Sequence, residues 1–89
     1  MTNSEFNEKY KDYLEDGHYG LAINIPTVTE FLDEMFSKVL IHVPGFKYSQ
    51  IKLKFNYSRV YTTINHPTLI SYIEAEIDSL VKKYDDDNC

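Results

Sequence analysis

The sequence is poor in cysteine, tryptophan, glycine and proline, and these scarcities exclude several classes of protein. Its single cysteine, Cys89, cannot form an intrachain disulfide, so the chain is not a disulfide-stapled secreted domain. Three glycines and three prolines in 89 residues are too few for a loop-dominated or disordered chain. No run approaches the roughly 18 apolar residues of a membrane span, and the polar N-terminus does not resemble a signal peptide. We therefore expect a soluble, cytoplasmic protein that makes no membrane contact.

Motifs that dictate a chemistry are also lacking. His18, His42 and His66 each stand without a second metal ligand at useful spacing. There is no P-loop, dinucleotide fingerprint or nucleophile elbow. Ser49, Ser58 and His66 offer one conceivable nucleophile and base, provided that the fold brings them together. We expect no enzyme activity, no cofactor and no metal.

Apolar residues at helical spacing predict three amphipathic helices, at residues 3–15, 27–43 and 67–84. Thr27 and Glu30 fit a capping box at the start of the second helix. The third helix is expected to end with two lysines in its last turn, where cations favour the helix dipole.

Alternation of apolar and polar residues predicts three strands, at residues 19–25, 49–55 and 60–64. In the second strand the alternation places one set of residues toward the core: Ser49, Ile51, Leu53 and Phe55. The turn between the second and third strands is expected at residues 56–58.

The predicted order α-β-α-β-β-α indicates a small two-layer α+β domain over residues 1–84, with a three-stranded sheet packed by amphipathic helices. The first two strands are separated by a helix, so we expect them to pair in parallel, and the last two to pair antiparallel. Residues 85–89, DDDNC, are expected to form an acidic flexible tail.

Charge is distributed unevenly along the chain. From Met35 through Ile73 there are five cations and no carboxylate, whereas the remainder holds 14 acids and four bases, for an overall net charge of −5. Such an asymmetry bears on partners rather than on fold. Internal complementarity, with acidic helices beside a basic sheet, explains it without any partner, and lysine also discourages aggregation of exposed strands.

The predicted hairpin is the candidate contact surface, because tyrosines alternate there with cations. The candidate binding residues are Tyr48, Lys52, Lys54, Tyr57, Arg59 and Tyr61. Tyrosine and arginine are enriched among the residues that dominate protein interfaces. Our leading hypothesis is therefore a non-enzymatic modulator, of the inhibitor or adaptor type, that acts by contacting a protein partner. In its size, acidity and lack of enzyme motifs the chain is similar to small modulatory proteins, including many encoded by phages.

Two other functions and one further mode of contact stay open. The same hairpin could bind single-stranded nucleic acid, with phosphates on the cations and bases on the tyrosines, although the chain is acidic overall. Alternatively, the acidic helices could imitate nucleic acid and block a basic surface. An unpaired edge of the sheet could also pair with a partner strand or with a second copy, giving a homo-oligomer.

Overall fold

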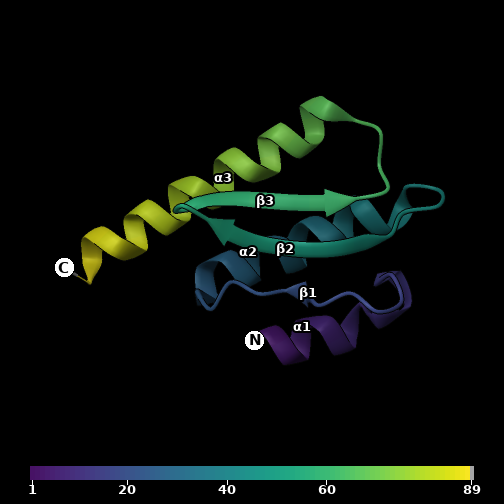
Figure 1. Cartoon of the computed structure of the whole chain (residues 1–89), viewed down its shortest axis with the longest axis horizontal. Helices are drawn as coiled ribbons and strands as arrows, with labels where there is room; N and C mark the ends of the chain where they lie inside the picture. Colours follow the sequence, from purple (N-terminus) through teal and green to yellow (C-terminus); the bar gives the residue numbers. More distant parts are fainter. Residues whose placement is uncertain (89) are drawn as a thin grey trace.

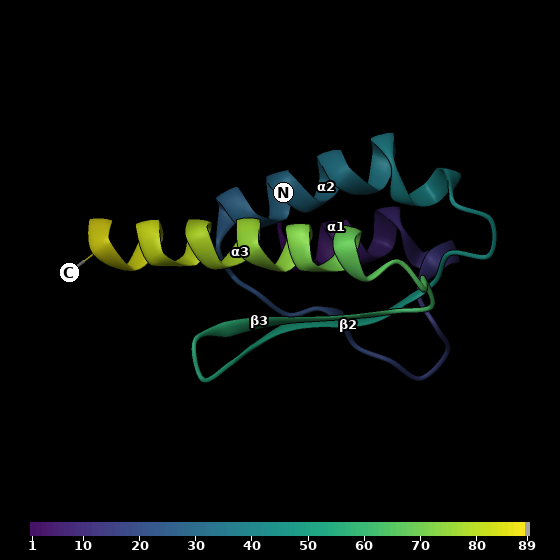
Figure 2. The same cartoon turned by 90° about the horizontal axis from the view of Figure 1, so that it is seen from above.

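The computed structural model of the chain describes residues 1–88. The chain folds into a layer of helices packed on one side of a sheet (Figures 1 and 2). The elements are, in chain order, α1 (Asn3–Lys9), the 3-10 helix η1 (Lys11–Tyr13), β1 (Gly20–Leu21), α2 (Pro26–Lys38), the 3-10 helix η2 (Leu40–His42), β2 (Tyr48–Lys54), β3 (Tyr57–Thr62) and α3 (Pro67–Asp87). The predicted α+β class and the order α-β-α-β-β-α are confirmed.

The sheet has the strand order β1-β2-β3. β1 pairs with β2 in parallel and β2 pairs with β3 antiparallel, as the connections predicted. β1 is much shorter than the expected strand at residues 19–25. Ile23 and Ile25 are still buried, but Tyr19, expected on the same face, is exposed. The left-handed conformation of Gly20, with φ +72°, precedes Leu21 and reorients the chain at that point.

The helix starts follow local capping chemistry. At α1 the Thr2 hydroxyl accepts from the Glu5 amide, and the Glu5 carboxylate accepts from the Thr2 amide, which makes a complete capping box. α2 begins at Pro26, with Ile25 as its N-cap, so the predicted capping box of Thr27 and Glu30 is wrong. The ring of proline fixes φ near its helical value, and proline lacks the N–H that the first helical position does not need. The helix therefore starts at Pro26, before that box.

The helix ends differ more from prediction than the starts. α1 ends at Lys9, and only η1 continues the predicted helix of residues 3–15. α3 runs to Asp87, so residues 85–87 belong to the helix and do not form the predicted acidic tail. As a result the last turn of α3 carries aspartates and no cation, contrary to the expected pair of lysines. The end of that predicted tail, Cys89, lies outside the described residues.

Aromatic side chains form the centre of the core, between α1, α2 and the start of β2. The Phe36 ring lies 4.8 Å from Phe6, 5.3 Å from Phe46 and 5.0 Å from Tyr48, measured between centroids. All three contacts are edge-on, the arrangement that aromatic pairs favour. The hydroxyl of the buried Tyr48 donates to Asn7 Oδ1 at 3.1 Å, so its one polar group is satisfied.

The buried hydroxyl of Tyr48 should make stability depend on alkaline pH. Burial raises the pKa of Tyr48 to about 12, above the ordinary tyrosine value of about 10. The folded state therefore keeps a proton that the unfolded chain loses, and stability falls by roughly 1.4 kcal/mol per pH unit between these values. Denaturant unfolding of the wild type and of Tyr48→Phe should show a wild-type advantage that shrinks from pH 10 to 12. A constant difference would contradict this account.

A second prediction concerns the glycine at the start of β1. A Cβ at Gly20 would overlap the side-chain oxygen of Asn7, whereas a Cβ at Gly17 would meet nothing within 4 Å. Both glycines have positive φ, at +72° and +79°. Gly17→Ala should therefore lower the free energy of unfolding by about 1 kcal/mol, which is the cost of holding alanine in the left-handed conformation. Gly20→Ala should lower the free energy of unfolding by at least about twice as much, because the hydrogen bonds between Asn7 and Leu21 are also lost. Equal midpoints in thermal unfolding would refute the close packing at Gly20.

Candidate functional site

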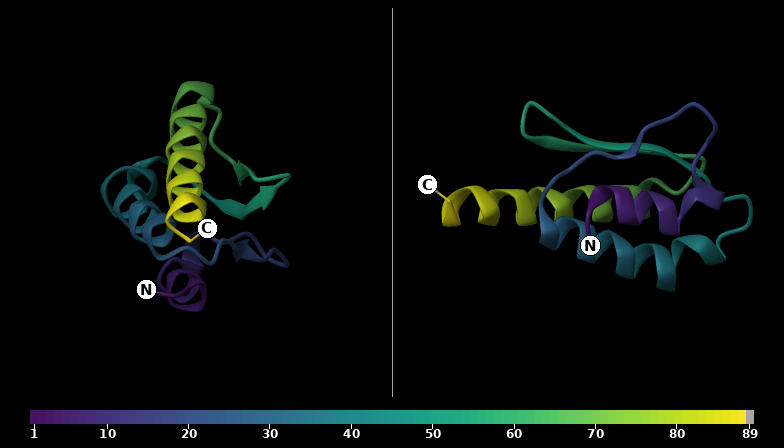
Figure 3. Two further views of the ribbon diagram at one scale, coloured as in Figure 1. Left: turned by 90° about the vertical axis from the view of Figure 1, so that its left-hand side faces the viewer. Right: turned by 90° about the horizontal axis from the view of Figure 1, so that it is seen from below.

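The side of the β2–β3 hairpin that faces away from the helices is the candidate binding surface. The pairs of opposite residues alternate between the two sides of the sheet, so Ile51 and Val60 are buried while Lys52 and Arg59 face outward. The outward residues, which we call the outer sheet face, are Gln50, Lys52, Lys54, Tyr57, Arg59 and Tyr61. The end-on view in Figure 3 shows the helices gathered on the opposite side of the hairpin.

Of the predicted site residues, all but Tyr48 lie together on the outer sheet face. Tyr57 and Tyr61 are 61% and 47% exposed. Tyr48 is fully buried against the aromatic core, so its place in the predicted site is wrong. The cause is an irregularity in the pairing between Tyr48 and Gln50, which shifts the alternation and turns Tyr48 inward together with Ile51. Alternation along the sequence carries no sign of such a bulge.

The hairpin turn is also displaced from its predicted position at residues 56–58. Lys54 pairs with Tyr57, which leaves a two-residue turn of Phe55 and Asn56 with φ of +53° and +66°. Two positive φ values are typical of a type I′ turn, whose twist matches that of the strands. Phe55 is therefore 84% exposed at the tip of the hairpin and not in the core as predicted. Asn56, a residue that tolerates the left-handed region, was the one signal for this turn.

The outer sheet face concentrates positive charge. Lys52 and Arg59 lie directly opposite each other, an arrangement of like charges that destabilises a sheet. The Lys52 ammonium lies 5.9 Å from the centroid of the Tyr61 ring, a cation–π arrangement. Among residues 1–88, the ion pairs closer than 4.0 Å all lie elsewhere: Lys9–Asp33, Lys11–Glu8, His18–Glu15 and Lys38–Glu34. The cations of the face are thus accessible to an external anionic group.

The outer edge of β3 is occupied by carboxylates from α3. The Ser58 amide donates to Asp78 Oδ1 at 2.7 Å and the Val60 amide donates to Glu74 Oε2 at 3.0 Å. The Ser58 hydroxyl also donates to the Glu74 carbonyl oxygen at 3.0 Å. Residues four apart on a helix advance about 6 Å and residues two apart on a strand advance about 6.6 Å, so the two spacings match.

The edge of β1 is occupied by one side chain from α1. Asn7 accepts from the Leu21 amide at 2.9 Å and donates to the Leu21 carbonyl oxygen at 3.2 Å. With these positions on both edges filled, strand addition would first have to displace Asn7 or the two carboxylates of α3. The hypothesis of edge pairing, for a partner or for a second copy, therefore loses its structural support.

The serines and histidines do not meet as the catalytic hypothesis required. The Ser49 hydroxyl donates to the Tyr61 carbonyl oxygen, and the buried Ser58 hydroxyl is bound to α3 as described. His66 Nδ1 accepts from the Leu69 amide and caps α3. Each of these three side chains thus has a separate structural hydrogen bond, and none of these bonds joins His66 to either serine.

The acidic surface is partly neutralised by contacts within the chain. Asp33 on α2 accepts from Lys9 at 2.8 Å and also from the Tyr10 hydroxyl. Although partial burial acts to raise it, these hydrogen bonds hold the pKa of Asp33 below its ordinary value. Glu34 is similarly bound by Lys38 at 3.0 Å. Asp33 and Glu34 of α2 are therefore not free to imitate phosphates, whereas Asp85, Asp86 and Asp87 of α3 have no ion pair within residues 1–88.

Comparison of the chain with protein-family models, with curated proteins and with solved structures found no match. Across residues 1–88, no three or more His, Cys, Asp or Glu side chains are grouped so that they could hold a metal ion. In that same part of the chain, no helix combines the length and the apolar character needed to cross a membrane.

Removing the carboxylates of α3 should open the edge of β3. We expect Glu74→Ala combined with Asp78→Ala to lower the free energy of unfolding by about 2–5 kcal/mol, because two amides lose charged partners. Hydrogen exchange at the Ser58 and Val60 amides should accelerate with it. Glu76→Ala on the same helix is the matched control and should change neither quantity, since Glu76 is exposed. Unchanged exchange at Ser58 and Val60 in the double variant would show that the carboxylates do not seal the edge.

Proposed function

We propose that this chain is a non-enzymatic binding protein, of the inhibitor or adaptor type, whose outer sheet face docks on an acidic surface of a protein partner. The observation that carries the proposal is the open face itself, where Lys52 and Arg59 lie opposite each other with tyrosines beside them and form no ion pair with a carboxylate of residues 1–88. An acidic partner would relieve this repulsion on binding. A cytoplasmic site of action suits a chain whose single cysteine cannot form an internal disulfide.

Contact through side chains on the face, and not through strand addition, follows from the occupied edges. Tyr57 and Tyr61 supply large, rigid contact areas with hydroxyls for the polar rim of an interface. Arg59 supplies planar donors that match a carboxylate. Charge on such a face governs the rate of encounter and the choice of partner more than it governs affinity. We therefore expect binding that weakens with salt but is not abolished by it.

Single-stranded nucleic acid is the second candidate for the same face, because exposed tyrosines beside cations are also how bases and phosphates are bound. It ranks behind a protein partner for two reasons. The net charge of −5 gives little long-range attraction to a polyanion. The face also offers only three cations, fewer than the extended basic grooves that follow a nucleic-acid backbone.

Charge reversal on the face tests the proposal. A protein partner should be captured by the wild type and by the control Lys82→Glu/Lys83→Glu, which makes the same charge change on α3. The variant Lys52→Glu/Arg59→Glu should bind the same partner at least about tenfold more weakly, a loss of about 1.4 kcal/mol. Capture that is equal for all three proteins would refute the proposal.

The same variants separate the two candidate partners. Fluorescence anisotropy with a labelled single-stranded oligonucleotide at low salt should show no binding by the wild type. Binding that is lost in Lys52→Glu/Arg59→Glu and falls steeply with salt would instead favour the nucleic-acid function.

A further inference from the structure

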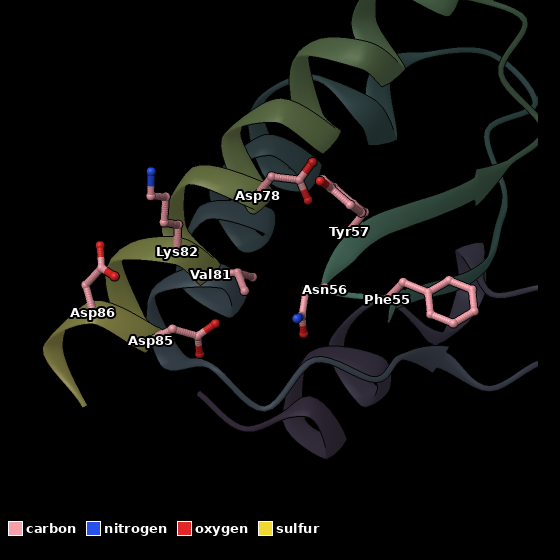
Figure 4. A pocket seen from close by; sticks show the side chains of 8 residues that line it. All are labelled: Phe55, Asn56, Tyr57, Asp78, Val81, Lys82, Asp85 and Asp86. Atoms are coloured by element: carbon pink, nitrogen blue, oxygen red, sulfur yellow. The ribbon is translucent and has the colours of Figure 1, made fainter. Parts of the chain in front are cut away.

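The tip of the hairpin and the C-terminal half of α3 form a groove of about 440 Å³, which shares Tyr57 with the outer sheet face. Its lining residues, all labelled in Figure 4, are Phe55, Asn56, Tyr57, Asp78, Val81, Lys82, Asp85 and Asp86. The groove exists because α3 extends beyond the hairpin turn, as Figure 2 shows. In Figure 4 the Tyr57 and Asp78 side chains lie near each other, whereas the Phe55 ring points away from α3.

Phe55 is an unusual residue to find at this tip. It is a bulky aromatic side chain in the left-handed region, at φ +53°, where glycine or asparagine is favoured. Its 84% exposure means that the strained backbone is not offset by burial within its own chain. The ring is therefore held in solvent, ready to contact another surface.

The groove has an excess of negative charge, with three carboxylates against one lysine among its lining residues, whereas the strand beside the turn carries Lys54. The last turn of α3 holds Asp85, Asp86 and Asp87 at the negative end of the helix dipole, where carboxylates are unfavourable and a cation is stabilising. No cation of residues 1–88 lies within 4.0 Å of these carboxylates. Lys54 adjoins the turn, with its ammonium 5.9 Å from the centroid of the Phe55 ring. One surface thus carries an aromatic ring with a lysine, and also a groove that has Tyr57 on one side, the nearly buried Val81 at its floor, and Lys82 and carboxylates at its rim.

We propose that the occupant of this groove is the hairpin tip of a second copy of the chain. In the resulting dimer, Phe55 of each copy lies in the groove of the other copy, between Tyr57 and α3, and Lys54 lies beside Asp85 and Asp86. Because the projecting group and the groove belong to the same surface, both contacts form at once around a twofold axis and the assembly closes at two copies. The edges of the sheet take no part, and the contact is distinct from the outer sheet face residues Lys52 and Arg59.

The experiment measures mass in solution by sedimentation equilibrium from about 1 µM to about 1 mM, since the dimer population depends on concentration. The wild type should approach the mass of two copies and should not exceed it. Phe55→Ala should shift the dissociation constant upward by at least about tenfold. Tyr72→Ala, at another exposed aromatic residue, which lies on α3 away from the groove lining, is the control and should leave it unchanged.

A charge swap tests the pairing across the dimer. Lys54→Glu alone and Asp85→Lys alone should each stay monomeric, because both symmetric contacts then bring like charges together. Mixed in equal amounts, the two variants should form a heterodimer, because each contact then joins opposite charges. Circular dichroism of the separate variants verifies that each is folded, and the exposure of both positions makes unfolding an unexpected result.

Three results would overturn the proposal: a wild type that stays monomeric at the highest concentration, a mixture of the charge variants that stays monomeric, or a mass that grows beyond two copies. Lys52→Glu/Arg59→Glu should remain dimeric while losing the protein partner. Failure of the dimer and failure of the proposed function are therefore separate outcomes.

Discussion

The hydrogen bonds from the edge amides of β3 to Glu74 and Asp78 fix the architecture on which the rest of this molecule depends. A strand at the edge of a sheet has amide groups that no neighbouring strand pairs with. Leaving such an amide buried without an acceptor costs free energy. The two carboxylates satisfy these amides and hold α3 lengthwise along β3. Once α3 is fixed there, its C-terminal half extends past the turn of the hairpin and forms the groove at Val81.

The same arrangement separates the two sides of the sheet by chemistry. All the α-helices lie on one side, where the aromatic cluster around Phe36 excludes water. The outer sheet face is left with Lys52, Arg59 and their neighbouring tyrosines, while several helix carboxylates are bound by lysines of the same layer. Opposite charges therefore pair within the helical layer, and the helix carboxylates do not pair with the cations of the sheet. This residual charge is what makes the face, and not the edge, a candidate for binding.

The α+β class, the order of the elements and the pairing of the strands could be predicted because each depends on a repeated pattern. Periodicities of 3.6 and 2 residues indicate which side of an element is apolar, and a helix between two strands favours parallel pairing. The candidate face was largely predictable for the same reason, since Lys52 and Lys54 alternate with apolar residues. Positions set by a single local event were predicted wrongly: the bulge that turns Tyr48 inward, and the turn that places Phe55 in solvent.

By itself the sequence determined the stripes of apolar residues and the uneven distribution of charge, because both are properties of neighbouring positions along the chain. Only the tertiary structure decided which polar groups meet across long separations. Asn7 reaches Leu21, and Glu74 reaches Val60, through contacts between elements that no local pattern encodes. The physical reason is that an amide at a strand edge donates to any suitably placed oxygen, and the packing of the helices selects which oxygen is within reach.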